Sequence, residues 1–309
     1  MNRIEITEVG LRDGLQSEKP FFATADKIDL GNRLVAAGLR RLEATSFVSP
    51  RAVPQLADAE AVIAGINPVA GLVLEALVPN ERGAARATAT NVNVWVAFAS
   101  ASESHSLANS NVDVDTALER IKPLGELAKS AGAELYGSVA VAYDCPFEGQ
   151  VETAQVLKLA KAYHAMGVRV LKLGDTIGSA SPRRVRELVT SLNAELPDMQ
   201  LILHFHDTRG MGLANVMAGL EAGVSRYESA IGGLGGCPFA PGASGNISTE
   251  DLVHLLHLEG LSTGIDLSAL IAVGKSLETK LDRPLPARLL RSEPVGTLYD
   301  LNAAVRASG

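Results

Sequence analysis

The chain has 309 residues, a formal net charge of −7 at pH 7 and 47% hydrophobic residues, with 29 glycines and 14 prolines. This is the composition of a folded globular protein with many turns, and it excludes intrinsic disorder and a collagen-like chain. At about 150 residues per domain, the length allows two domains or one large barrel. The acidic balance without a block of like charges argues against nucleic-acid and anionic-membrane partners.

No segment of the sequence resembles a membrane span or a signal peptide. The most apolar stretch, residues 61–74, is short and contains Gly, Asn and Pro, whereas a spanning helix needs about 20 apolar residues. Charged residues stand near the N-terminus where a signal peptide has an apolar run. We therefore expect a cytoplasmic protein, in which Cys145 and Cys237 are separate thiols and not a disulfide.

Short β-branched runs alternate along the chain with segments of helical periodicity, and we predict eight such units. Glycines follow several of the predicted helices, where helix C-caps are expected. The strands are predicted over residues 3–9, 40–45, 69–77, 91–99, 133–141, 168–173, 199–206 and 224–231. The helices are predicted over 24–37, 53–64, 80–89, 113–131, 151–166, 181–195, 211–222 and 248–259.

Strict alternation of strands and helices with short connections requires parallel strands, and eight repeats predict an α/β fold of the (β/α)8 TIM-barrel type. The alternative is an open doubly wound sheet, but residues 9–14 (VGLRDG) do not form its glycine-rich phosphate turn. We predict a catalytic barrel over residues 1–265. Residues 266–309 are predicted to form an extension with one helix over 266–281 and a tail from Arg283.

Reactive side chains follow or end several of the predicted strands. In a barrel the active site is built from the loops at the carboxyl ends of the strands, so these side chains are predicted to converge on one face. They are Arg12 and Asp13 after the first strand, Glu43 in the second, Asp175 after the sixth, His204 and His206 in the seventh, and Cys237 and Asn246 after the eighth.

The two histidines are the sharpest local signal. Side chains two residues apart on a strand point the same way, so His204 and His206 can bind one metal ion together, although a hydrogen-bonded pair in the core is an equal alternative. Asp13 and Asn246 lie at the same predicted barrel mouth and favour the metal. Two imidazoles, one carboxylate and one amide oxygen suit Mg²⁺ or Mn²⁺ best, with Co²⁺ or Zn²⁺ as alternatives.

The glycine-rich segment 232–245 contains Cys237. Ordering so many glycines is entropically costly, which favours a mobile active-site loop over a plain connection. Cys237 is therefore a candidate acid or base. Cys145, in the sequence Asp144-Cys145-Pro146, is predicted to be a packing residue. Asp13 beside a glycine and Arg12 beside it also have plainer interpretations, as a turn residue and a surface ion pair.

Five segments, in order along the chain, resemble the 3-hydroxy-3-methylglutaryl-CoA lyase family. The likeness runs from residue 4 to about residue 270, and the loop with the cysteine is its most specific part. The segments are EVGLRDGLQSE at 8–18, LEATSFVSP at 42–50, LGDTIG at 173–178, HFHDT at 204–208 and GGLGGCPFAPGASGN at 232–246.

The resemblance implies cleavage of 3-hydroxy-3-methylglutaryl-CoA to acetyl-CoA and acetoacetate, an acyl-CoA substrate and a homodimer. It also implies a divalent cation that polarises the substrate hydroxyl and is bound by four residues. These residues are Asp13, His204, His206 and Asn246.

The same resemblance implies roles for five further residues. Asp175 accepts the proton of the tertiary alcohol, and Arg12 faces the thioester oxygen on which charge develops. Cys237 donates a proton to the enolate carbon. Glu8 and Glu43 orient Arg12 or a metal-bound water without binding the metal themselves.

Three positions depart from the family pattern, since Val170, Lys172 and Arg209 stand where glutamate, serine and tyrosine are expected. Two additional cations near the site could change the acyl group accepted, unless they face the helices or solvent. The alternatives are therefore the same chemistry on citramalyl-CoA or on a longer 3-substituted 3-hydroxyglutaryl-CoA. A condensing synthase of the same barrel group and an inactive metal-binding barrel that acts as a partner or sensor also remain open.

Overall fold

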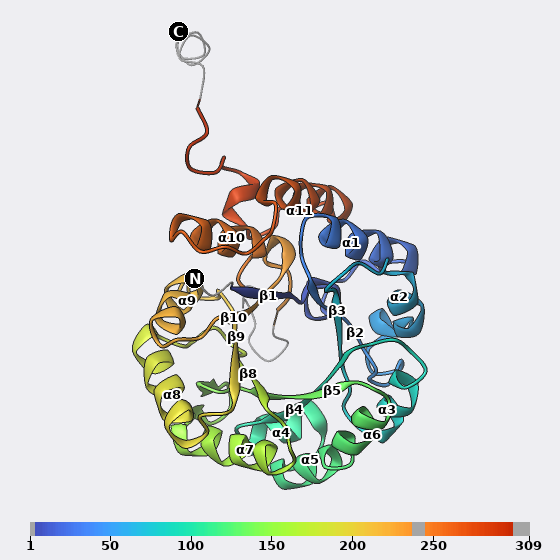
Figure 1. The fold of residues 1–309 in the computed structure, drawn as a ribbon, viewed down its shortest axis with the longest axis vertical. Helices are drawn as coiled ribbons and strands as arrows, with labels where there is room; N and C mark the ends of the chain where they lie inside the picture. The colour runs from blue at the N-terminus through green and yellow to red at the C-terminus, as the bar shows by residue number, and fades with distance from the viewer. Residues whose placement is uncertain (1–3, 237–244, 299–309) are drawn as a thin grey trace.

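Eight parallel strands form a closed barrel in the computed structural model, which describes residues 4–236 and 245–298. Around the barrel the strands follow the order β1-β10-β9-β8-β5-β4-β3-β2, and helices surround them (Figure 1). The (β/α)8 prediction is thus confirmed. The barrel strands are β1 (Glu5–Glu8), β2 (Arg41–Ser46), β3 (Val73–Leu77), β4 (Val94–Ser100), β5 (Glu134–Ala140), β8 (Val170–Asp175), β9 (Gln200–Phe205) and β10 (Arg226–Ser229).

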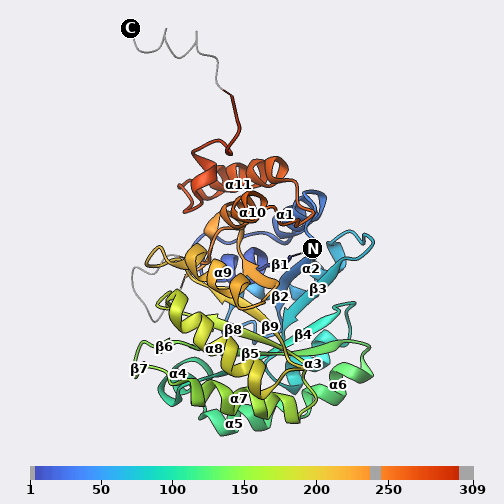
Figure 2. The same ribbon diagram turned by 60° about the vertical axis from the view of Figure 1, so that its left-hand side comes forward.

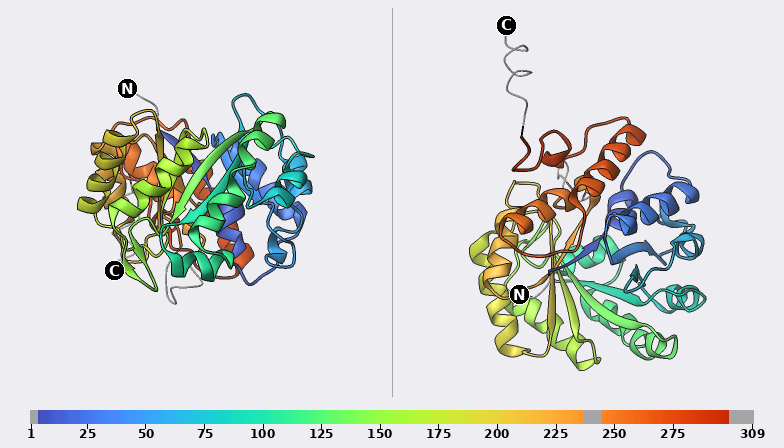
Figure 3. Two further views of the ribbon diagram at one scale, coloured as in Figure 1. Left: turned by 90° about the horizontal axis from the view of Figure 1, so that it is seen from below. Right: turned by 45° about the horizontal axis from the view of Figure 1, so that its top comes forward.

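The helices pack their apolar faces against the outside of the barrel, where the main hydrophobic core lies. Figures 2 and 3 show α10 and α11, in orange and red, on the same side of the barrel as the blue α1. The helices are α1 (Thr24–Ala36), α2 (Ala59–Gly65), α3 (Glu81–Ala87), α4 (Glu103–Ser110), α5 (Val114–Ile121), α6 (Leu124–Ser130), α7 (Thr153–Ala165), α8 (Pro182–Glu195), α9 (Gly212–Glu221), α10 (Thr249–Leu258) and α11 (Leu267–Leu281).

The predicted strands all occur, and the third begins four residues later than expected, at Val73. The helix predicted over 113–131 is wrong as one element. It is divided into α5 and α6 at Pro123, which lacks an N–H and cannot continue the helix hydrogen bonds. Helix α4, which begins after the N-cap Ser102, was not predicted because its short sequence has little apolar periodicity.

A short hairpin follows β5 and was also not predicted. It is formed by β6 (Asp144–Cys145) and β7 (Gly149–Gln150). Cys145 is buried, and the Ser102 hydroxyl donates a hydrogen bond to its sulfur over 2.9 Å. The predicted boundary between a barrel of 1–265 and an extension of 266–309 stays a prediction, and α11 packs on α1 and α10.

The interior of the barrel is divided into an apolar layer and a charged layer. Side chains on a strand alternate, so Val170 and Lys172 of β8 both point inward. The apolar layer contains Val94, Val96, Tyr136, Val170 and Ile202. Buried Glu43, Glu75, Lys172 and Glu228 lie one step further along their strands, toward the carboxyl ends. Among residues 4–236 and 245–298, no helix combines the length and the apolar character of a membrane span.

Candidate active site

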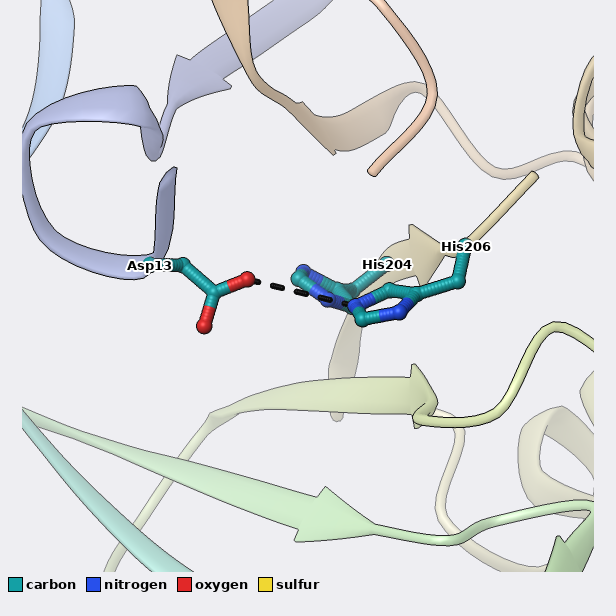
Figure 4. Close-up of side chains that lie close together, drawn as sticks. All are labelled: Asp13, His204 and His206. Carbon is teal, nitrogen blue, oxygen red and sulfur yellow. Dashed lines mark ion pairs between the residues drawn. The ribbon is translucent and has the colours of Figure 1, made fainter. Parts of the chain in front are cut away.

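Three of the four predicted metal ligands meet at the carboxyl ends of the strands. Asp13 comes from η1 (Gly10–Gly14), a single π-helical turn after β1, while His204 lies near the end of β9 and His206 directly follows that strand. One ligand atom from each residue lies within 4.8 Å of the others. Figure 4 shows the Asp13 carboxylate facing both imidazoles, with 3.9 Å between Asp13 Oδ2 and His206 Nε2.

Asn246 joins this group through its amide. Its Nδ2 donates hydrogen bonds to Asp13 Oδ2 over 2.8 Å and to the carbonyl oxygen of Leu234 over 2.9 Å. The amide oxygen of Asn246 is buried and has no hydrogen-bond partner. Gly235 permits this approach because a Cβ there would lie 2.5 Å from Nδ2, and its φ of +114° suits glycine.

The two imidazoles have different partners. Nδ1 of His204 contacts Glu228 Oε2 at 2.9 Å, which leaves its Nε2 available to a ligand. Nδ1 of His206 is buried without a partner. Burial and the neighbouring His204 lower the pKa of His206 to about 4, which keeps it neutral at pH 7. Burial opposes the charged form of His204, but the hydrogen bond and charge of Glu228 raise its pKa overall.

These residues fit a divalent cation. The Asn246 amide oxygen is buried and accepts no hydrogen bond, and it lies with a neutral imidazole and a carboxylate. Such converging groups can all coordinate one cation. The mixed oxygen and nitrogen set is compatible with Mg²⁺ or Mn²⁺, and also with Co²⁺ or Zn²⁺. The predicted set of Asp13, His204, His206 and Asn246 is thus brought to one place.

Arg12 lies between the candidate ligands and the charged layer. Its Nη1 donates to Asp13 Oδ1 over 2.7 Å, and its Nε donates to Glu43. Burial disfavours the charge, but the Coulombic attraction of Glu43 and Asp13 prevails and raises the pKa of Arg12. Arg12 is therefore a fixed, permanently charged group, and the predicted pairing partner Glu43 is in direct contact with it.

A cavity of about 320 Å³ opens in front of these groups. Arg12, Asp13, His204 and His206 line it together with apolar side chains, and the polar His105, Asn109 and Ser138 also take part in the lining. Gly236, the last described residue before Cys237, also lines the cavity. A pocket with an apolar lining and a few convergent polar groups is typical of a small-molecule site. The apolar side chains belong to Val48, Ala52, Val53, Leu77, Val96, Phe98 and Ala140.

Asp175, the predicted general base, is the last residue of β8. Its neighbours Gly174 and Thr176 line the cavity, and its own Oδ2 is buried without a hydrogen-bond partner. The Asp175 carboxylate accepts hydrogen bonds from the backbone N–H groups of Ser179 and Ala180, at 2.8 and 3.1 Å. Burial raises its pKa to about 6. Oδ1 of Asp175 thus holds the turn before α8, and the assignment of Asp175 as the general base stays a prediction.

Replacing Asp175 with asparagine tests whether Asp175 is the general base. The amide oxygen can still accept from Ser179 and Ala180 but cannot take a proton. We expect kcat to fall by roughly 10²–10⁴-fold, the usual effect of removing an acid–base group. Steady-state kinetics at saturating metal measure this, and near-normal kcat would leave Asp175 only its structural role at the turn before α8.

Glu8 is the last residue of β1 and is buried shortly before η1. Its carboxylate accepts hydrogen bonds from the backbone N–H groups of Gly10 and Ile231, at 2.7 and 2.8 Å, and from the hydroxyl of Thr249. It thus ties η1, the turn that carries Arg12, to the segment after β10, and its predicted role in orienting Arg12 or a metal-bound water stays a prediction. Burial raises the pKa of Glu8 to about 7.

Four buried residues of this region were not assigned a role from the sequence. Glu250 accepts the N–H of Gly232 at the base of the glycine-rich loop, at 2.8 Å, and burial raises its pKa to about 8. Glu228 orients His204, and Lys172 and Glu75 complete the charged layer. For Lys172, Glu75 and Glu228, the available signal was a charged residue at an inward position of a predicted barrel strand, whereas Glu250 lies on α10 and had no such signal.

The two cations that depart from the family pattern lie in different places. Lys172 is buried inside the barrel and lines the cavity. Arg209 donates to the carbonyl oxygens of Ile177 and Gly178 over 2.8 and 3.0 Å, and so ties two loops together. Of the two, only Lys172 is placed to influence the site.

A barrel whose strand ends gather two imidazoles, carboxylates and a fixed arginine around a cavity defines an enzyme of the metal-dependent barrel class. The HMGL-like family matches residues 3–277. The chain belongs to this family.

Known relatives are similar in sequence to nearly the whole chain. The hydroxymethylglutaryl-CoA lyase YngG of Bacillus subtilis is 41% identical over 289 residues, covering 94% of this chain and 97% of the relative. The mitochondrial hydroxymethylglutaryl-CoA lyase of Rattus norvegicus is 40% identical over 290 residues, covering 94% and 89%.

Solved structures show the same likeness. An HMG-CoA lyase from Acinetobacter baumannii, in complex with coenzyme A and 3-methylmalate, superimposes with a TM-score of 0.92 at 40% identity, covering 97% of this chain and 98% of that one. The carboxyl transferase domain of Rhizobium etli pyruvate carboxylase has a TM-score of 0.70 at 17% identity, a likeness of fold alone.

Proposed function

We propose that this chain is a metal-dependent carbon–carbon lyase that cleaves 3-hydroxy-3-methylglutaryl-CoA to acetyl-CoA and acetoacetate. The observation that carries the proposal is the convergence of Asp13, His204 and His206, with ligand atoms within 4.8 Å of one another, on a cavity that Arg12 also lines. The relatives named hydroxymethylglutaryl-CoA lyases support the substrate.

Asp13, His204, His206 and the amide oxygen of Asn246 are the residues that would bind the cation. When bound, a divalent cation lowers the pKa of a hydroxyl that coordinates it and fixes the substrate's orientation. Mg²⁺ and Mn²⁺ are the metals that we favour for this donor set. Glu228 keeps the Nδ1 side of His204 occupied, so that its Nε2 faces the cavity.

Arg12 is the residue that stabilises the acetyl thioester enolate. Its guanidinium lines the cavity and is held on two sides by Glu43 and Asp13. A positive charge that is already oriented does not have to reorganise as negative charge develops on the thioester oxygen. The role of Glu43 in this proposal is to fix the direction of Arg12.

Cys237 lies outside the described residues, and its role as proton donor to the enolate carbon rests on the sequence. The described chain on both sides of residues 237–244 supports it, because Gly236 lines the cavity and Asn246 contacts Asp13. We expect Cys237→Ser to lower kcat by about 10²–10⁴-fold, the usual effect of an acid–base group, with KM nearly unchanged. Cys145→Ala, in a buried packing position, serves as control, and near-normal turnover of Cys237→Ser would remove Cys237 from the mechanism.

The remaining partner assignments follow from the family. The structure that contains coenzyme A and 3-methylmalate supports an acyl-CoA substrate for this chain as well. A homodimer and a cytoplasmic location complete the proposal.

Product analysis tests the proposed function. The purified chain is incubated with Mg²⁺ or Mn²⁺ and, separately, with 3-hydroxy-3-methylglutaryl-CoA, citramalyl-CoA and a longer 3-substituted analogue, and products are identified by mass spectrometry. We expect acetyl-CoA and acetoacetate from the first substrate at the highest kcat/KM. Preference for another thioester would correct the substrate, and no cleavage of any of them would favour the inactive-barrel alternative.

A further inference from the structure

Lys172 stands at the centre of the charged layer inside the barrel. Its ammonium group forms ion pairs with three carboxylates: Glu43 Oε2 and Glu75 Oε2, each at 2.8 Å, and Glu228. All four side chains are at most 3% exposed. The contact with Glu43 is a hydrogen bond, and the contacts with Glu75 and Glu228 are ion pairs.

Two of these carboxylates continue directly into the candidate active site. Glu43 accepts a hydrogen bond from Arg12, and Glu228 contacts Nδ1 of His204 at 2.9 Å. The third, Glu75, leads away from the site, since its other ionic partner is Arg41 at 2.8 Å. The Lys172 ammonium group therefore links Glu43, the partner of Arg12, to Glu228, the partner of the candidate metal ligand His204.

The cation is needed to hold this arrangement together. Without Lys172, three carboxylates with oxygens within 4.8 Å of one another would repel in a buried environment. Glu43 and Glu228 would then turn away from each other or bind protons. Either change alters the hydrogen bonds that they accept from Arg12 and His204.

We propose that Lys172 is a positioning residue that sets Arg12 and His204 relative to each other through Glu43 and Glu228. It does not touch the candidate ligands itself; it acts through the two carboxylates. The catalytic part of this inference rests on the proposed function, whereas the part that concerns His204 is tested by metal binding alone.

Two variants separate positioning from charge balance. Lys172→Met removes the ammonium and leaves uncompensated buried carboxylates, so it also threatens folding. The double variant K172M/E75Q removes one positive and one negative charge, keeping the net charge of the layer and leaving Glu43 and Glu228 unchanged. Glu75→Gln alone is the matched control, because Lys172 keeps both of its partners at the site.

Mn²⁺ is the probe, with affinity measured by calorimetry and free Mn²⁺ counted by electron paramagnetic resonance. We expect K172M/E75Q to fold and to bind Mn²⁺ about 10–100-fold more weakly, the usual effect of losing an outer partner of a metal ligand. With 3-hydroxy-3-methylglutaryl-CoA at saturating Mn²⁺, kcat is expected to fall more than KM rises. Glu75→Gln is expected to retain wild-type Mn²⁺ affinity.

If K172M/E75Q has the Mn²⁺ affinity and the kcat of the wild type, the inference is overturned. Lys172 would then only neutralise the buried carboxylates. An equal loss in Glu75→Gln alone would overturn it too, because the effect would then not depend on the ammonium. If the wild-type protein does not cleave the thioester, the proposed function fails, but the comparison of Mn²⁺ affinities still decides the role of Lys172.

Discussion

Replacing Arg12 with methionine is expected to lower kcat by at least about 10²–10³-fold, the loss seen when one preorganised donor to a developing oxyanion is removed. Methionine replaces the aliphatic part of the arginine side chain but carries no charge, so the thioester oxygen loses its cation. Asp13 keeps the hydrogen bond from Asn246, and for this reason Mn²⁺ binding should change much less than kcat.

Arg12→Lys is the matched variant for this prediction. Lysine keeps the charge but lacks the planar fork that reaches Glu43 and Asp13 together. We expect it to recover only part of the lost activity. Steady-state kinetics and Mn²⁺ titration of both variants provide the measurement, and normal turnover of Arg12→Met would show that the guanidinium does not stabilise the enolate.

Replacing His204 with alanine is the second change with a large expected effect. It removes a candidate ligand and leaves Glu228 without the imidazole that it contacts at 2.9 Å. We expect Mn²⁺ affinity to fall by more than the roughly 10–100-fold typical of an outer-shell change, with a matching loss of kcat at limiting metal.

His164→Ala is the control for the histidine prediction. His164 lies on α7, where its Nε2 contacts the exposed Asp198 at 2.9 Å, and it is not among the residues that line the cavity. This variant should bind Mn²⁺ like the wild type. If both alanine variants bind Mn²⁺ equally well, His204 is not a ligand, and the metal site would have to be sought elsewhere.

The positions of the strands and the residues at their carboxyl ends could be predicted from the sequence. The period of the apolar residues is a local property, and it places His204 and His206 on one side of β9 without any knowledge of other strands. Parallel strands carry their carboxyl ends to one face, which also predicts that Asp13 and Asn246 meet the histidines. The helix predicted across Pro123 failed because the apolar pattern continues through a residue that ends a helix.

Which way a side chain faces at a strand end was decided by the tertiary structure. Asp175 and Glu8 are acidic residues in motifs that resemble catalytic ones, and both also accept hydrogen bonds from backbone N–H groups. One of these donors, Ile231, lies far from Glu8 along the chain and reaches it only when the barrel closes. A sequence motif identifies the acidic residue but does not show which buried N–H groups donate hydrogen bonds to its carboxylate.

The sequence by itself determined the barrel, the face that carries the site and the set of candidate metal ligands, because side-chain periodicity and strand direction are properties of short segments. The ion pairs of Lys172 with Glu43, Glu75 and Glu228 join residues from four strands. Only closure of the barrel brings those strands around one point, and only burial there makes each charge depend on the others.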